Sequence, residues 1–367
     1  MDMDRPANIQ NDRNQSTHEL YSLLIMISTP KKVEEMANYA LANGAVGAFF
    51  SYARGTLPNH ILSILGLANV KREIAVLAVP SSMASSLLDN INRQFNLAEK
   101  LGGIAYLISL EKTSTESDDE PEDTYSMIAT IVNEGEGEDV VKQVRSSYPI
   151  GASILHALGS VNHSKKTFNF EIVPSKEIVL IITRKNLCEA IYRKIHDSLR
   201  TELPGRGVIF STNIDKVAGI FEKNRETEKV ITENYNKLMN SESCATSSDL
   251  PPAPTANETA EQDKTHQIAV LALVDRGHTG DVVRLAETVG NRGATIMRGR
   301  FTERESRGFL SQTGDIGKEA VIMVATKETA LAILRQLRQY AATHADEHIL
   351  LTWMRIHSFS RFSYGNE

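Results

Sequence analysis

Two glycines flank an arginine in the stretch Pro204-Gly205-Arg206-Gly207, and this combination is suited to binding an anion. Glycine adopts positive φ angles without strain, so successive backbone N–H groups can converge on a phosphate while Arg206 adds positive charge. The alternative is structural, because a glycine commonly ends a helix and begins a tight turn. The residue types alone therefore leave a phosphate-binding loop and a helix C-cap open.

Catalytic and metal-binding patterns give much weaker signals. His344 and His348 lie four residues apart, a spacing that suits a metal pair if a helix continues through them. A third ligand is missing from the neighbourhood, so we interpret the pair as solvated histidines. The sequence contains no nucleophile elbow, no P-loop, no HExxH motif and no strand-linked GxGxxG. We therefore expect neither an enzyme nor a bound metal.

The elements that must position the glycine loop recur three times along the chain. Each copy has a glycine that begins an apolar strand-like stretch and a glutamate 26 residues later: Gly47 and Glu73, Gly151 and Glu177, Gly293 and Glu319. Further apolar strand-like runs precede the glycine and follow the glutamate, and stretches with helical periodicity lie between them. The order is strand, helix, strand, strand, helix, strand. We expect an α+β protein of three ferredoxin-like (βαββαβ) repeats.

Changes in composition divide the chain further. Acidic and Pro-rich polar stretches cannot bury enough apolar surface to fold, so they read as linkers. The predicted organisation is a flexible N-terminal tail at 1–18, repeats at 19–112, 124–222 and 266–367, an acidic linker at 113–123, and a charged and polar linker at 223–265.

The strand after each glutamate is apolar at every position, namely residues 74–79, 178–182 and 320–325. Such a run is typical of a strand buried on both faces, whereas a sheet with one face in water alternates apolar and polar residues. An uncovered face would cost several kcal/mol at about 25 cal/mol per Å². We therefore expect the three sheets to cover one another around a pseudo-threefold axis.

Bulk composition narrows the partners and the compartment. The net charge of −6 gives no electrostatic reason to expect nucleic acid or an anionic membrane. No apolar run approaches the roughly 20 residues of a membrane span. The two cysteines, Cys188 and Cys244, form no metal-ligand spacing and no disulfide framework. We expect a cytoplasmic protein without membrane insertion.

Several motifs in this register resemble the PII signal-transduction (nitrogen-regulatory) family. They are Gly-Ala-(Ser/Thr)-Ile at Gly151 and Gly293, KEIVLI at 176–181, LPGRGVIF at 203–210 and VAGI at 217–220. The resemblance implies a cytoplasmic, non-enzymatic regulator in which adenine nucleotides bind in the clefts between ferredoxin-like subunits and T-loops contact target proteins. Here three tandem PII-like repeats would stand for the three subunits, as a pseudo-threefold trimer in one chain.

The resemblance also implies which residues bind the ligand, expected to be ATP, ADP, AMP or a cyclic nucleotide. The phosphates would lie at Gly205, Arg206 and Gly207, beside the base of a short T-loop formed by Gly159, Ser160 and Val161, with a cation from the neighbouring repeat supplied by Arg361. Secondary candidates are Arg54, Gly55, Thr56, Gly102 and Gly103. The third repeat has Ala345 to Ile349 at the loop position, without glycine, so we expect at most one or two competent clefts.

Two other functions stay open at this stage. One is a scaffold that has lost ligand binding, or a partner of another PII protein, which the missing glycines of the third repeat favour. The other is a metal or ion-tolerance protein similar to the trimeric CutA family. The target protein is not identified by the sequence. The expected assembly is a monomeric pseudo-trimer, with a dimer formed by exchange of repeats as the alternative.

Overall fold

The computed structural model describes ten stretches of the chain: residues 20–56, 69–97, 102–110, 124–148, 150–160, 174–201, 207–220, 267–303, 316–344 and 349–362. The predicted N-terminal tail, both predicted linkers and residues 57–68, 161–173 and 304–315 of the predicted T-loops lie outside these stretches. The boundaries of the predicted domains therefore stay a prediction.

The described residues form three segments in which helices and strands follow the same order. The first segment contains β1 (Tyr21–Ser28), α1 (Pro30–Ala42), β2 (Gly47–Thr56), β3 (Asn69–Pro80), α3 (Ser81–Phe95) and β4 (Ile104–Ser109). The second contains β5 (Tyr125–Asn133), α4 (Gly137–Arg145), β6 (Ala152–Gly159), β7 (Ser175–Arg184), α5 (Lys185–Thr201), β8 (Gly207–Ile214) and a short β9 (Lys216–Ala218).

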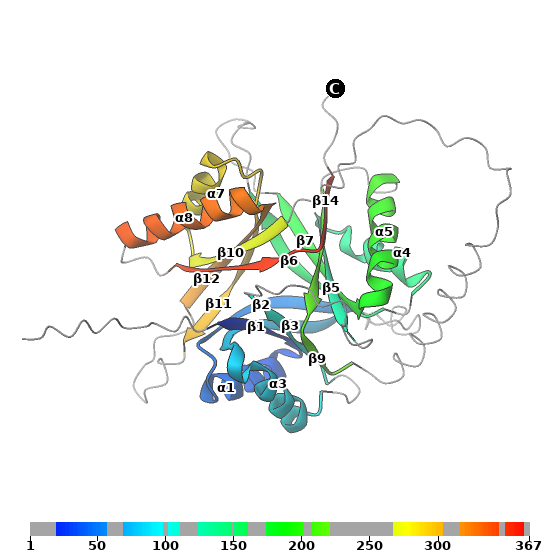
Figure 1. Ribbon diagram of the computed structural model, residues 1–367. Coiled ribbons are helices and arrows are strands. Elements are labelled where there is room, and N and C mark those ends of the chain that lie inside the picture. Colours follow the sequence, from blue (N-terminus) through cyan, green and yellow to red (C-terminus); the bar gives the residue numbers. More distant parts are fainter. Residues whose placement is uncertain are drawn as a thin grey trace, which may run out of the picture.

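The third segment contains β10 (Gln267–Asp275), α7 (Thr279–Thr288), β11 (Thr295–Glu303), β12 (Ile316–Thr326), α8 (Lys327–Thr343), β13 (Leu350–Arg355) and β14 (Ser358–Phe362). Figure 1 shows the three helix pairs on the outside of the molecule and the strands between them. Local sequence explains the helix ends: Pro30 opens α1 with a φ angle preset for a helix, and Thr326 caps α8 by accepting a hydrogen bond from the Thr329 N–H.

The expected fold, three ferredoxin-like repeats packed as a pseudo-threefold PII-like trimer, is wrong. The described strands form one mostly antiparallel sheet of fourteen strands, and hydrogen bonds cross from each segment to the others. β2, β6 and β11 pair with one another, β9 pairs with β4, and β14 pairs with β8. Separate compact repeats would leave these edges unpaired, and an unpaired backbone N–H or C=O that is buried is costly. Pairing across the segments gives the N–H and C=O groups of these edges their hydrogen-bond partners.

The pairings at the three junctions share one register. Arg54 of β2 lies opposite Ile154, Arg300 of β11 opposite Phe50, and Leu158 of β6 opposite Ile296. In each pair the first residue lies seven positions after the anchor glycine of its segment, and the second lies three positions after the anchor of the next. Residues at the same distance from an anchor glycine therefore occupy equivalent places, which permits direct comparison of the three junctions.

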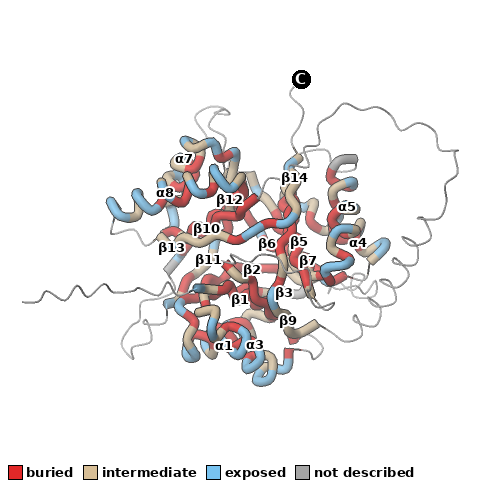
Figure 2. The backbone as a smooth tube through the Cα atoms, in the orientation of Figure 1, coloured by how far each residue is buried: buried red, intermediate tan, exposed pale blue. Residues whose placement is uncertain are grey.

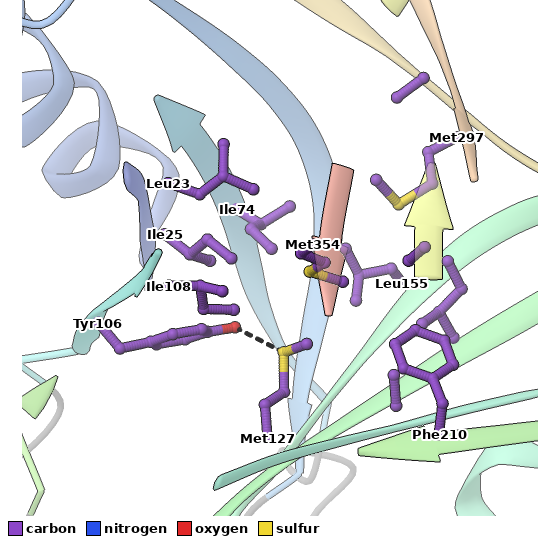
Figure 3. Packing of buried hydrophobic residues seen from close by; sticks show 14 of the residues in the cluster. Leu23, Ile25, Ile74, Tyr106, Ile108, Met127, Leu155, Phe210, Met297 and Met354 are labelled. Atoms are coloured by element: carbon purple, nitrogen blue, oxygen red, sulfur yellow. Dashed lines mark hydrogen bonds between the residues drawn. The ribbon is translucent and has the colours of Figure 1, made fainter. Parts of the chain in front are cut away.

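Each segment buries its strands on two sides, as predicted from the continuous apolar runs. One face packs on the helices: Ala75, Leu77 and Val79 belong to the cluster under α1 and α3. The other face joins a central cluster, to which Ile74 of the first segment, Leu155 of the second and Met297 of the third all contribute. Figure 2 shows this buried interior among the strands, and Figure 3 shows side chains from all three segments packed together. The molecule therefore has one shared core and three outer ones.

Gly299 of β11 marks a close backbone approach between the third and first segments. A Cβ at this position would overlap the carbonyl oxygen of Phe50 and lie 2.6 Å from the ring of Phe49. We expect Gly299→Ala to lower the free energy of unfolding by about 1–3 kcal/mol, because the β11–β2 pairing must shift to make room. Denaturant unfolding measures this. The control is Gly151→Ala, where no atom lies within 4 Å of the added Cβ and the expected change is within about 0.5 kcal/mol. Equal stability of the two variants would contradict the close approach.

Candidate functional site

The junction between the second and third segments contains most of the predicted binding residues. β6 ends at Gly159, which pairs with Thr295 at the start of β11. The Ser160 N–H donates to the Ala294 carbonyl at 2.8 Å, and the Ala294 N–H donates to Ser160 Oγ at 2.9 Å. These two bonds hold Ser160 against the turn between α7 and β11.

The same turn contacts the end of the third segment. In the ladder between β14 and β8, Phe362 lies opposite Gly207 and Arg361 lies opposite Val208. The Arg361 guanidinium donates through Nη1 to the carbonyl of Arg292 at 3.0 Å. Since Arg292 is two residues from Ala294, the structure brings together Gly159, Ser160, Gly207 and Arg361. Val161, Gly205 and Arg206 lie outside the described residues, although Arg206 directly precedes Gly207 in the chain.

Positive charge accumulates at this junction. Arg292 and Arg361 have no carboxylate partner among the described residues, and both remain exposed to solvent. The surrounding protein atoms, and next the charge of Arg292, lower the pKa of Arg361. A lowered guanidinium pKa means that the charged form is disfavoured where it stands. Burial is the larger of the two causes, so an anion that bound Arg361 would stabilise its charged form.

Asn291, in the same turn, is a buried amide with one group unused. Its side-chain Nδ2 donates to the Gly293 carbonyl at 2.9 Å, and only 5% of its surface is exposed. Its Oδ1 is buried without a hydrogen-bond partner. A buried acceptor of this kind costs roughly 1–3 kcal/mol unless a donor reaches it. The turn between α7 and β11 therefore carries one cation, Arg292, and one hydrogen-bond acceptor without a donor, Asn291 Oδ1.

Helix α5 supports β14 from the other side. The Tyr192 hydroxyl donates to Ser360 Oγ at 2.9 Å, and burial raises the pKa of Tyr192 to about 12. The rings of His196 and Phe362 lie with their centroids 5.0 Å apart. These contacts fix the strand that carries Arg361, so its guanidinium has a defined position.

The junction between the first and second segments also contains predicted binding residues, but here the arginine forms ion pairs with glutamates of the protein. Arg54 donates to Glu177 at 2.6 Å and to Glu138 at 3.0 Å, which neutralises its charge within the protein. Thr56 donates through Oγ1 to the Ala152 carbonyl, and Arg145 donates to the carbonyl of Thr56. Gly55, between them, pairs with Ser153 in the β2–β6 ladder.

Gly102 and Gly103 serve close packing of the backbone in this structure. The Ser28 hydroxyl donates to the Gly102 carbonyl at 2.9 Å. Gly103 has φ +112°, and a Cβ there would lie 2.6 Å from the Ile27 carbonyl oxygen. Gly219 occupies the place equivalent to Arg361, and a Cβ on it would overlap the Gly103 carbonyl. This junction therefore has packed backbone where the second–third junction has an arginine.

The junction between the third and first segments also contains an arginine paired with a buried glutamate. Arg300 of the third segment donates to both carboxylate oxygens of Glu73, at 3.2 and 3.3 Å. At its loop position, only Ile349 of the stretch from Ala345 to Ile349 lies within the described residues. Of the two histidines interpreted as solvated, His344 follows the end of α8 at Thr343 and stacks on Tyr340, and His348 lies outside the described residues. The described residues contain no group of three His, Cys, Asp or Glu side chains able to hold a metal ion.

Sequence reasoning did not identify Arg292, Asn291 or the Arg–Glu pairs of the other junctions. A signal for Arg292 was present, because the residues at the equivalent place before the other anchor glycines are Val46 and Ile150, both apolar. The partners of Glu73 and Glu177 come from different segments, so no local spacing could reveal them.

Comparisons with known proteins leave the family open. Neither a family model nor a curated protein matches the chain. An aspartate kinase from Synechocystis is similar at 8% identity with a TM-score of 0.21, over 91% of this chain and 43% of the kinase, so the chain spans less than half the length of that protein. A Fusobacterium nucleatum protein called "Putative monooxygenase" is similar at 7% identity with a TM-score of 0.19, over 67% of this chain and 98% of the other. Likenesses this weak assign neither fold nor activity. Within the described stretches, no helix has the length and apolarity to cross a membrane.

Proposed function

We propose that this chain is a PII-like regulatory protein that binds an adenine nucleotide, such as ATP, ADP, AMP or a cyclic nucleotide, at the junction of its second and third segments. The proposal assigns it to the cytoplasm, gives it no catalytic step and no nucleic-acid partner, and has it control a partner protein through the short T-loops. One observation carries the proposal: Arg292 and Arg361 lie together without an acidic partner among the described residues, beside Gly207 and Ser160.

The residues present fit the parts of a nucleotide. Phosphate oxygens accept charge-assisted hydrogen bonds from guanidinium groups, and these are the stronger hydrogen bonds in proteins. The Gly205-Arg206-Gly207 sequence adds backbone donors and a third arginine next to the described part of the site. Ribose hydroxyls and the adenine amino group can donate hydrogen bonds. Asn291 Oδ1 is an acceptor that has no donor.

Asymmetry between the junctions supports a single site per chain. Arg54 and Arg300 are paired with buried glutamates, and the equivalent residue at the second–third junction is Leu158. The charges of Arg54 and Arg300 are therefore already neutralised by the protein. In the described part of the chain, the second–third junction brings Arg292 and Arg361, which have no carboxylate partner there, next to Gly207, so we infer one nucleotide per chain.

The test is a thermal-shift and calorimetric titration with ATP, ADP, AMP and cyclic nucleotides. A bound nucleotide at a hundred times its Kd is expected to stabilise the protein by about 2.7 kcal/mol. Arg361→Met should weaken the affinity about tenfold to a hundredfold, because a charge-assisted hydrogen bond contributes about 1.5–3 kcal/mol. Arg292→Met should weaken it in the same direction.

Arg338→Met is the matched control, because Arg338 lies exposed on α8 and away from the junction. It should leave the affinity unchanged. Absence of stabilisation by every nucleotide, or an affinity indifferent to Arg361→Met, would contradict the proposed site.

A second candidate is a ligand-free scaffold or partner of another PII protein. The closed Arg54–Glu177 and Arg300–Glu73 junctions favour it, because they hold the segments together without any ligand. If the chain is a scaffold, the amount of partner recovered in a pull-down should not change when nucleotide is added or when Arg361 is replaced by Met. For the regulator, nucleotide changes the partner affinity. We take the chain as a monomer, and exchange of the third segment between two chains would instead give a dimer in sedimentation.

A further inference from the structure

The third segment reaches the candidate site through its last strand. β14 follows β13, crosses to the second segment and pairs with β8 from Ser358, opposite Ser211, to Phe362, opposite Gly207. Among the described strands, β14 lies at the end of the strand order, with β8 as its neighbour. None of its five residues is fully buried, whereas β8 is mostly buried. A short edge strand with little buried surface opens at a low free energy.

Side-chain hydrogen bonds hold β14 on the second segment. The Tyr192 hydroxyl of α5 donates to Ser360 Oγ at 2.9 Å, and the Thr212 hydroxyl of β8 donates to the Arg355 carbonyl, three residues before β14, at 2.8 Å. Figure 1 shows β14 beside α5. These bonds do not involve the arginines of the candidate site, so a substitution can loosen β14 and leave those arginines in the chain.

The second and third segments share little other strand pairing. β6 and β11 form two residue pairs, whereas the β2–β6 and β11–β2 ladders form four each. Leu158 stands where the other segments have Arg54 and Arg300, which bind glutamates of the adjoining segment, and Glu319 binds Arg298 of its own segment at 3.0 Å. With five pairs to β8, β14 therefore makes most of the strand pairing between these two segments.

Docking of β14 places a cation where its charge is disfavoured. Arg361 Nη1 donates to the Arg292 carbonyl, and burial, followed by the charge of Arg292, lowers the pKa of Arg361. Both causes disfavour the charged guanidinium in the docked strand. An oxyanion that accepts hydrogen bonds from Arg361 stabilises this charge, and with it the docked position of β14.

The candidate site is assembled only while β14 is docked. Gly207 and Ser160 belong to the second segment, whereas Arg361 is carried by β14. When β14 leaves β8, the site loses Arg361, and loss of a charge-assisted hydrogen bond weakens affinity about tenfold to a hundredfold. A ligand shifts an equilibrium by the ratio of its affinities for the two states. A saturating ligand therefore favours the docked strand by the same factor.

We propose that β14 is a strap under ligand control: an oxyanion ligand at the second–third junction holds β14 on β8, and β14 detaches more readily without that ligand. The inference rests on the proposed nucleotide site, and it names how occupancy of that site changes the chain. What the nucleotide regulates is the contact between β14 and β8, and through it the attachment of the third segment to the second.

Hydrogen exchange of the full chain tests the strap, with and without a saturating amount of ATP or whichever nucleotide stabilises the chain in the thermal-shift titration. Exchange of the β14 amides should slow about tenfold to a hundredfold when nucleotide is bound. The matched control lies in the same chain. β9 covers β4 as β14 covers β8, but Gly219 stands at the place of Arg361. Exchange in β9 should stay unchanged.

Two variants separate docking of the strand from binding of the ligand. Tyr192→Phe removes one hydrogen bond to β14, so it should speed β14 exchange about two- to tenfold without nucleotide, and nucleotide should still slow that exchange. Arg361→Met should remove most of the slowing by nucleotide. If Tyr192→Phe does not speed the exchange, β14 does not exchange by undocking, and the strap is wrong.

The remaining outcomes distinguish the strap from the proposed function. If a nucleotide stabilises the chain but leaves β14 exchange as it was, the strap is overturned and the nucleotide site stands. Equal protection of β9 and β14 would mean that the ligand tightens the whole chain, which also overturns the strap. If no nucleotide stabilises the chain, the proposed function fails and the strap fails with it.

Discussion

Replacing Arg54 with methionine is expected to lower the free energy of unfolding by about 3–5 kcal/mol. The Glu177 side chain is 2% exposed and accepts hydrogen bonds from Arg54 at 2.6 Å and from the Gly137 N–H at 2.9 Å. Methionine fills much of the volume but leaves the carboxylate buried without its cation. The loss arises at a junction, so it measures how far the first and second segments depend on each other. Urea unfolding followed by circular dichroism measures it.

A matched control separates this junction from ordinary surface pairs. Arg193 pairs with Glu189 one turn earlier on α5, and their side chains are 70% and 54% exposed. Arg193→Met should cost less than about 1 kcal/mol. In the double variant Arg54→Met with Glu177→Gln, the amide oxygen still accepts from Gly137 and no charge is buried. That variant should regain at least half of the loss, and a double variant as unstable as Arg54→Met would contradict the buried-charge explanation.

The sequence predicted local structure well because local structure follows periodicity. The order of helices and strands in each segment agrees with the apolar spacing, and the unbroken apolar run after Glu73 corresponds to a strand between the helix-covered and central clusters. Burial on both faces is a property of each strand by itself, so its residues record it.

Assembly of the strands was not predictable in the same way. The pairing of Arg300 with Phe50 or of Phe362 with Gly207 joins residues far apart in the chain, and the sequence pattern of an edge strand resembles that of a paired one. Sheets were therefore expected to meet only through their faces, whereas their edges are also joined. An apolar run shows which faces of a strand are buried, but it does not show which strand pairs with the N–H and C=O groups along its edge.

For the candidate site, the resemblance to the PII family predicted the glycine and serine positions. The contacts around these residues are seen only in the fold. Arg361 lies beside Gly207 because β14 pairs with β8, and Arg292 contributes because the α7–β11 turn passes next to Arg361. Neither neighbour is close in sequence to the loop at Gly205 and Gly207. Whether these residues bind a nucleotide stays a prediction.

The central cluster should couple all three segments, and Leu155→Ala is the substitution that tests it. Leu155 of β6 is fully buried and packs in a cluster with residues of every segment, including Ile74 and Met297 (Figure 3). Removing its side chain beyond Cβ should lower the free energy of unfolding by about 2–5 kcal/mol. Because the lost contacts reach all three segments, hydrogen exchange should accelerate in β1–β4, in β5–β8 and in β10–β13 together.

Leu88→Ala provides the comparison at equal burial. Leu88 of α3 is also fully buried, but its cluster consists almost entirely of first-segment residues, with Ala218 of β9 at its margin. The loss of stability should be of similar size, about 2–5 kcal/mol, whereas the faster exchange should be confined mainly to the first segment. The two substitutions remove the same side chain, so their exchange patterns differ only through the clusters they disturb. If Leu155→Ala accelerates exchange in the second segment alone, the segments fold as separate units and the central cluster does not join them.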